Sequence, residues 1–259
     1  MQIDKLLLVP QRQEIESFVQ LSKTYGCGFE YNDFFLPALL DDEEELNQRI
    51  VFYSKRENRP AFSTMHGAFF DVTIFSDDPK IKEVSKYRVK QSLEIAKRLG
   101  ASAVIFHTNY IPNFTAQSYR ESWVDRNAAF WSKMAQEYPM LSIYMENMFD
   151  TDCRLLAKLG EKMQGCGNFG ICFDYSHAQV FGDENQIGEW VETLAPFVKH
   201  LHINDHDFET DLHLALGEGK TDWQQFCKYY ERYFKNASVL LEVTGIEKTR
   251  KSLDYLSRL

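Results

Sequence analysis

The chain has 259 residues, of which 44% are hydrophobic and 26% charged, a composition typical of a globular protein and not of a disordered or fibrous one. Its formal net charge of −9 argues against nucleic acid or an anionic membrane as a partner attracted by overall charge. The apolar run 6–9 is too short for a signal sequence or a membrane span, so we expect a cytoplasmic protein with no membrane partner. The five cysteines form no C-x-x-C pair, and their odd number favours reduced thiols over a disulfide framework.

Short apolar runs alternate with longer amphipathic stretches along the whole chain. In chain order, we expect strand 5–9 before helix 14–24, strand 29–32 before helix 43–56, strand 62–66 before helix 81–99, and strand 103–107 before helix 120–137. The second half continues with strand 142–146 and helix 153–163, strand 170–174 and helix 186–196, strand 199–203 and helix 223–234, and strand 239–243 and helix 248–256. Gly100 directly follows the third helix, as glycine often does where a helix ends.

This alternation predicts an α/β fold. Strands that are apolar almost throughout and separated by helices favour a parallel sheet covered on both faces, and eight such repeats favour closure into a single (β/α)8 TIM barrel. We expect one domain spanning residues 1–259. An open doubly wound sheet is the alternative, but the chain contains neither G-x-G-x-x-G nor G-x-x-x-x-G-K-[ST], so a dinucleotide or P-loop site is not indicated.

Residue types that bind metal ions stand at the ends of six successive predicted strands. In a parallel barrel the carboxyl ends of all strands open onto one face, so these side chains should converge. They are His66, His107, Glu146, Asp174, His202 and Glu242. Three further candidates lie in the loops just beyond: His177 after the sixth strand, and Asp211 and His213 after the seventh. Imidazole nitrogens mixed with carboxylate oxygens suit Zn²⁺, Mn²⁺ or Co²⁺ better than Mg²⁺ or Ca²⁺.

The carboxylates among these candidates are the most informative. Glu146, Asp174 and Glu242 each end an apolar run, where an ionised carboxylate is costly to bury without a partner. No lysine or arginine ends a predicted strand, which favours a metal ion as that partner. We interpret His200, one pleat deeper than the strand end, and His206, in a polar loop, as structural or solvated residues.

The pattern resembles the xylose-isomerase-like TIM-barrel superfamily, which contains sugar isomerases and epimerases and the apurinic-site endonuclease IV. The resemblance covers nearly the whole chain. It is carried by Met-Glu-Asn at 145–147, Asp-Tyr-Ser-His at 174–177, His-Leu-His-Ile-Asn-Asp at 200–205, His-Leu-Ala-Leu-Gly-Glu-Gly at 213–219 and Leu-Glu at 241–242. It implies a metalloenzyme and is compatible with a homo-oligomer.

Resemblance to the isomerases and epimerases implies one divalent ion bound by Glu146, Asp174, His202 and Glu242. Glu146 and Glu242 would then be the catalytic pair, exchanging protons with a carbon of a small sugar, polyol or hydroxy-ketone through an enediolate. This is the first hypothesis. One departure counts against it, because epimerases of this kind usually carry an arginine several residues after the histidine of the seventh strand, and 204–211 contains none.

Resemblance to endonuclease IV implies up to three zinc ions, held by all nine side chains. His66, His107 and a bridging Glu146 would bind one ion, the four residues named above a second, and His177, Asp211 and His213 a third. The four carboxylates carry about −4, so one divalent ion leaves the site negative, whereas three leave it at about +2 and suit a phosphate. A multinuclear zinc phosphoesterase is therefore the alternative.

Two features of the loops bear on the substrate. They carry few basic residues, which does not favour a nucleic-acid partner, although the endonuclease branch keeps one open. They are also rich in aromatic rings, which could wall a pocket for a carbohydrate-like small molecule or simply pack onto helix ends. The candidates for substrate contacts are Phe69, Tyr110, Asn147, Trp223 and Lys220. A barrel that binds a sugar or a metal without turnover is a third hypothesis.

Overall fold

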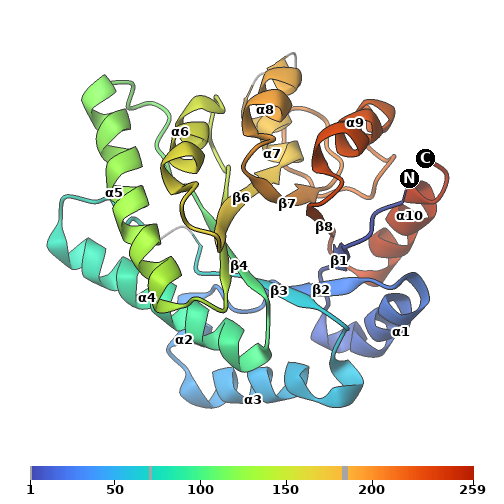
Figure 1. The fold of residues 1–259 in the computed structure, drawn as a ribbon. Coiled ribbons are helices and arrows are strands. Elements are labelled where there is room, and N and C mark those ends of the chain that lie inside the picture. Colours follow the sequence, from blue (N-terminus) through green and yellow to red (C-terminus); the bar gives the residue numbers. More distant parts are fainter. Residues whose placement is uncertain (1, 70–71, 183–185) are drawn as a thin grey trace.

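Eight parallel strands, taken in chain order, form a closed barrel (Figure 1). In the computed structural model, which describes residues 2–69, 72–182 and 186–259, the strands are β1 Leu6–Leu8, β2 Gly28–Tyr31, β3 Ser63–His66, β4 Ala103–His107, β5 Ser142–Glu146, β6 Phe169–Asp174, β7 Val198–Ile203 and β8 Ser238–Leu241. The ring closes where β1 pairs with β8, with Leu7 beside Leu240. The predicted TIM barrel is confirmed, and the open doubly wound sheet is wrong.

Helices surround the barrel (Figure 1). The main helix after each strand is, in order, α1 Ile15–Tyr25, α3 Glu43–Ser54, α4 Pro79–Leu99, α5 Gln117–Glu137, α6 Arg154–Met163, α8 Ile187–Leu194, α9 Trp223–Tyr229 and α10 Ile246–Leu256. The sequence did not predict α2 Pro37–Leu40 and α7 Tyr175–Val180, which are too short to show a helical period. The predicted helix 223–234 is α9 followed by a π-helical turn, Tyr230–Phe234.

Helix α4 illustrates how local sequence sets these elements. Asp78 accepts a hydrogen bond from the backbone N–H of Lys80, and Pro79 occupies the first helical position. Gly100 ends the helix with φ at 71°, a left-handed conformation that glycine adopts without strain. Between these ends, a buried apolar stripe that includes Leu93 packs against the barrel, and each such side chain stabilises the fold by about 1.5–3 kcal/mol.

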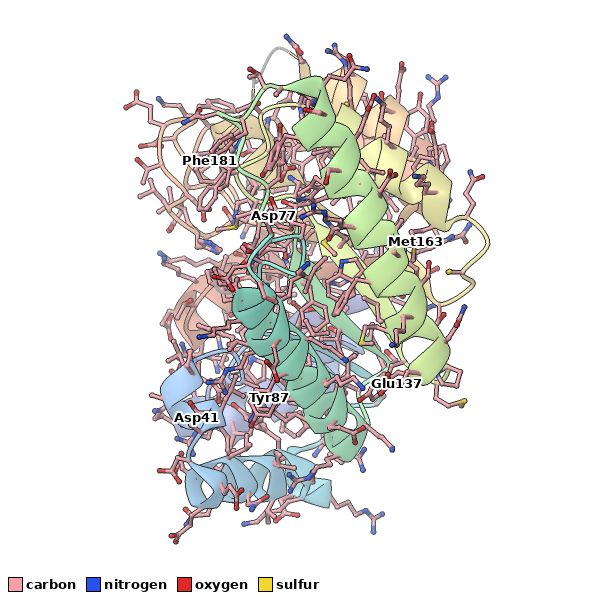
Figure 2. The ribbon with its side chains drawn as sticks, turned by 90° about the vertical axis from the view of Figure 1, so that its left-hand side faces the viewer. Asp41, Asp77, Tyr87, Glu137, Met163 and Phe181 are labelled. Carbon is pink, nitrogen blue, oxygen red and sulfur yellow. The ribbon has the colours of Figure 1, made fainter. Side chains whose placement is uncertain are left out.

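The strands present alternate residues to the helices and to the barrel interior. Phe106 of β4 lies 5.0 Å from the ring of Trp131 on α5, so the next residue, His107, points inward. The strand register places the backbone of His107 beside Glu146. In Figure 2 the loops that follow the strands lie on the left, where Phe181 is labelled. The candidate metal ligands therefore gather at that end of the barrel.

Two expectations from composition can also be compared with the structure. All five cysteines are free. Among the residues that the structure describes, no helix is both long enough and apolar enough to cross a lipid bilayer.

Candidate metal centre

Glu146, at the end of β5, stands between two sets of histidine nitrogens. Its Oε2 lies 3.3 Å from Nε2 of His66 and 3.3 Å from Nε2 of His107. Its Oε1 lies 3.1 Å from Nδ1 of His202. A carboxylate whose two oxygens face different groups of nitrogen donors is positioned to bridge two metal ions.

The central group consists of Glu146, Asp174, His202 and Glu242, whose donor atoms all lie within 4.8 Å of one another. Nδ1 of His202 lies 3.3 Å from Oε2 of Glu242 and 4.0 Å from Oδ2 of Asp174. Among the described residues, neither of these two carboxylate oxygens has a hydrogen-bond partner, although both are buried. Buried oxygens without partners that converge on one point fit a cation, because desolvated acceptors are costly unless they are compensated.

The outer group consists of His177, Asp211 and His213. Oδ2 of Asp211 lies 3.3 Å from Nε2 of His177 and 3.1 Å from Nε2 of His213, and all three donor atoms lie within 4.8 Å of one another. This group is the most accessible, with the side chain of Asp211 21% exposed and that of His213 31% exposed. His213 has φ at 45°, a conformation that is rare for residues other than glycine and is often found at functional sites.

Backbone carbonyls fix the orientation of three candidate histidines. Nδ1 of His66 bonds the carbonyl of Gly67 at 3.1 Å, and Nδ1 of His213 bonds the carbonyl of Glu242 at 2.8 Å. Nδ1 of His177 bonds the carbonyl of Asn147 at 3.0 Å. A carbonyl oxygen only accepts, so each Nδ1 carries the proton and each Nε2 presents its lone pair to its group, which is the arrangement that metal-binding histidines adopt.

Asp174 and Asn147 lock the end of β6 to the end of β5. The amide of Asn147 donates to the carbonyl of Asp174 at 2.8 Å and accepts from its backbone N–H at 2.9 Å. The carboxylate of Asp174 caps α7 by accepting from the N–H of His177 at 2.6 Å. This cap explains why the unpredicted helix α7 begins here, and it turns His177 toward the outer group.

The buried carboxylates of these groups are stabilised by nearby positive charge. In the described parts of the chain, no lysine or arginine pairs with the carboxylates of the central group. Burial raises the pKa of Asp174 to about 7. Burial opposes protonation of His213, but its hydrogen bond with Asp211 raises its pKa to about 9. The carboxylates thus draw protons onto neighbouring histidines, and divalent cations would supply the same charge more fully.

A cleft of about 460 Å³ opens above these residues, and it is lined by side chains that include Phe35, His66, Phe69, His213, Glu242 and Lys248. Of the five predicted substrate contacts, Phe69 lies in its wall. Its ring centroid is 4.4 Å from that of His107, edge to face. The cleft therefore brings an aromatic wall and an ammonium group next to the outer and central groups.

The other predicted substrate contacts lie elsewhere. Tyr110 is buried, and its hydroxyl donates to the carbonyl of Phe114. Trp223 is 2% exposed, and its Nε1 donates to Asp205, so it packs beneath the loop after β7. Asn147 is buried in the lock between β5 and β6, and the exposed Lys220 is not among the residues that line the cleft.

Two residues at the site were not singled out from the sequence. Glu30 of β2 is fully buried below the central group, with Oε1 3.1 Å from Nε2 of His202. Its signal was a lone carboxylate inside the short strand Gly28–Tyr31. Lys248 of α10 donates from Nζ to the carbonyl of His213 at 2.9 Å, and nothing in its local sequence marks it.

The two histidines interpreted as structural or solvated are both buried. Nδ1 of His200 lies 2.7 Å from the hydroxyl of Ser238, and its Nε2 lies 3.1 Å from Oε2 of Glu30. His206 lies 3.2 Å from the side-chain oxygen of Gln179. His200 thus stabilises the interior of the barrel, and His206 stabilises the loop after β7.

Comparison with known proteins places this geometry in a family. A family model described as the xylose isomerase-like TIM barrel matches residues 21–259. The chain belongs to this family. Among relatives of this xylose isomerase-like barrel, an uncharacterized protein of Methanocaldococcus jannaschii is 23% identical over 201 residues, covering 74% of this chain and 68% of that protein. A probable endonuclease 4 of Mycobacterium leprae is 23% identical over 167 residues, covering 58% of this chain and 62% of that protein.

Solved structures show the same fold. A protein of Thermus thermophilus, whose crystals were soaked with ZnCl2, is 25% identical with a TM-score of 0.77, covering 99% of this chain and 97% of that one. The D-psicose 3-epimerase of Clostridium cellulolyticum, solved with D-tagatose, is 14% identical with a TM-score of 0.71, covering 99% of both chains. The chain is therefore similar in sequence to proteins named as probable endonucleases and similar in fold to a protein named as a sugar epimerase.

Proposed function

We propose that this xylose isomerase-like barrel is a multinuclear zinc phosphoesterase, with metal ligands drawn from the nine candidate side chains. The observation that carries the proposal is the division of the donor atoms into three adjoining groups: His66, His107 and Glu146; the central group, which shares Glu146 with the first; and the outer group. A single-ion isomerase needs only the central group. A single-ion site does not explain why the other five candidate side chains also direct donor atoms toward the same end of the barrel.

The charge of the centre supports the same choice. The four candidate carboxylates give about −4, and the buried Glu30 behind His202 makes it about −5. One divalent ion leaves this strongly negative, whereas three convert it to about +1. A phosphate ester carries negative charge and would be repelled by the first arrangement and attracted by the second. Lys248, which lines the cleft, adds a further positive charge beside the outer group.

Bound divalent ions would act as Lewis acids toward a phosphate and would lower the pKa of water. The residues of this chain would do the rest. Glu146 would contribute ligand atoms both to the group with His66 and His107 and to the central group. Phe69 would exclude water from one side of the cleft, and Lys248 would orient the phosphate by its charge.

The relatives are consistent with this proposal without deciding it. A probable endonuclease 4 is among the sequence relatives, and a solved neighbour was soaked with a zinc salt. The net charge of −9 does not favour a long DNA duplex, so we propose a small phosphate ester or a short nucleic-acid segment as substrate.

A metal-dependent sugar epimerase is the second candidate. It is favoured by the position of Glu146 and Glu242, whose carboxylates approach Nδ1 of His202 at 3.1 and 3.3 Å and could flank one sugar carbon. Fold neighbours named as epimerases add to it. In this case Mn²⁺ or Co²⁺ at the central group alone would suffice.

Metal content and two assays separate the candidates. We expect close to three zinc ions per chain by elemental analysis, and zinc-dependent cleavage within a panel of phosphate esters that includes an abasic-site duplex. Glu146→Gln should abolish that cleavage. One ion per chain, together with solvent deuterium entering a C–H position of a ketose, would instead establish the epimerase.

A further inference from the structure

A buried network lies one layer below the central group, inside the barrel. Glu30 of β2 is its hub, and it is completely buried. Its Oε2 accepts a hydrogen bond from the hydroxyl of Thr64 at 2.6 Å and lies 3.1 Å from Nε2 of His200. Its Oε1 lies 3.1 Å from Nε2 of His202, and neither of these two buried atoms has a hydrogen-bond partner among the described residues.

The chemistry of these contacts assigns the protons. A carboxylate only accepts, so His200 must carry its proton on Nε2 and accept at Nδ1 from the hydroxyl of Ser238, 2.7 Å away. The two bonds to Oε2 hold the carboxylate in place. Oε1 is thereby fixed opposite His202, whose Nε2 must be the protonated nitrogen if it is to make a favourable contact.

We propose that Glu30 is the positioning residue of the metal centre, which holds the His202 ring so that its Nδ1 faces the metal ion of the central group. The proton kept on Nε2 leaves the Nδ1 lone pair free, toward Glu146 and Glu242. A carboxylate behind a metal-binding imidazole also makes the ring a stronger donor, and loss of such a partner typically costs about 10–100-fold in metal affinity. The inference requires an ion at the central group, as the proposed function does, but it does not depend on which reaction follows.

The burial of Glu30 argues against a role in stability alone. Among the described residues, neither lysine nor arginine pairs with it, so its charge has only histidines and a hydroxyl as partners. An isolated buried carboxylate destabilises a fold. A positively charged His202–metal unit removes that cost, which explains why a carboxylate occupies an otherwise apolar strand.

The test compares two isosteric substitutions of buried carboxylates. Glu30→Gln removes the charge behind His202. Asp150→Asn is the matched control, because Asp150 is also buried near the same end of the barrel but bonds Thr108 and the N–H of Met148 and no histidine. Zinc affinity is measured by competition with a chromophoric chelator. We expect one of the zinc sites to weaken about 10–100-fold in Glu30→Gln, and every site to weaken less than about threefold in Asp150→Asn; equal affinities in the two variants would overturn the proposal.

A second measurement needs no variant and so holds even if Glu30→Gln fails to fold. Long-range ¹H–¹⁵N spectra of the zinc-loaded protein report which nitrogen of each imidazole carries a proton. We expect His202 to bind zinc through Nδ1 and to keep a slowly exchanging proton on Nε2. The donor atoms of Cys172, His200 and His202 also lie within 4.8 Å of one another, so Cys172 is a competing ligand for His202. Zinc on Nε2 of His202 would refute the positioning role, as would a sulfur-to-cobalt charge-transfer band from Cys172 in the Co²⁺ protein. A wild-type chain that binds no metal would refute both the proposed function and this inference, whereas a zinc-loaded chain with zinc on Nε2 of His202 would refute this inference alone.

Discussion

Asp174→Asn should stabilise the metal-free protein and destabilise the zinc-loaded one. Burial raises the pKa of Asp174 to about 7, whereas an unfolded aspartate ionises near 3.8. Ionisation therefore favours the unfolded chain, and the cost to stability begins above about pH 4 and is complete above about pH 7. A difference of about three pKa units corresponds to a penalty of a few kcal/mol at pH 8 and to less than half of that at pH 5.

Asparagine removes this cost and keeps the local structure, because its side-chain oxygen can still cap α7 by accepting from His177. In a chelating buffer at pH 8 we expect the melting temperature to rise by about 10 °C, and by much less at pH 5. With zinc at about a million times its Kd, wild type gains about 8 kcal/mol per site, which the variant loses at the central group. This loss exceeds what the variant gains by removing the buried charge, so the order of stability should reverse.

Asp222→Asn is the control for these melts. Asp222 caps α9 through the N–H of Gln225 in the same way, but it is exposed and lies outside the three groups of donors. Its substitution should change stability by only a few tenths of a kcal/mol at either pH. If Asp174→Asn is no more stable than wild type at pH 8 without metal, or gains as much at pH 5, the electrostatic reasoning is refuted.

Three shorter predictions concern the outer group and the cleft. His213→Ala should lower the zinc content by one ion per chain and leave the other two, which elemental analysis would detect. Lys248→Met should raise the KM for a phosphate ester about tenfold (about 1.4 kcal/mol) with little change in kcat; Lys251→Met, which breaks only a surface pair with Glu218, should not. Stepwise chelation should remove the accessible outer ion first, and simultaneous loss of all zinc would contradict that order.

The barrel and the convergence of the strand-end residues could be predicted because the architecture turns sequence position into spatial position. His107, Glu146 and Asp174 each end an apolar run, and strand ends of a closed parallel barrel must share one face. No knowledge of side-chain packing was needed. That these side chains bind metal remains a prediction.

The wall of the cleft could not be predicted in the same way. Tyr110 and Trp223 follow strands, as Phe69 does, yet they turn into the protein because of partners that sequence spacing does not reveal. Trp223 turns toward Asp205, whose carboxylate also accepts from the N–H of Gly217. A loop side chain is placed by such contacts, whereas a strand side chain is placed by alternation alone.

Glu30 was overlooked for a different reason. Glu30 lies one residue before the end of β2, Gly28–Tyr31, so it does not belong to the set of strand-end residues. The two-residue alternation was sufficient to find it, because Phe29 and Tyr31 are apolar and must face the helices, which directs Glu30 into the barrel. A charged residue alone on the inner face of a barrel strand indicates a buried polar network and should be given the same weight as one at the strand end.

Because the candidate carboxylates lie on separate strands, the repulsion between their charges arises only at a certain stage of folding. Glu146, Asp174 and Glu242 come from three strands or strand ends, so no local segment of the chain brings two of them together. The unfavourable energy arises only when β5 to β8 assemble. Zinc that binds the assembled group would therefore stabilise these strands together and not any one segment, which couples metal binding to folding.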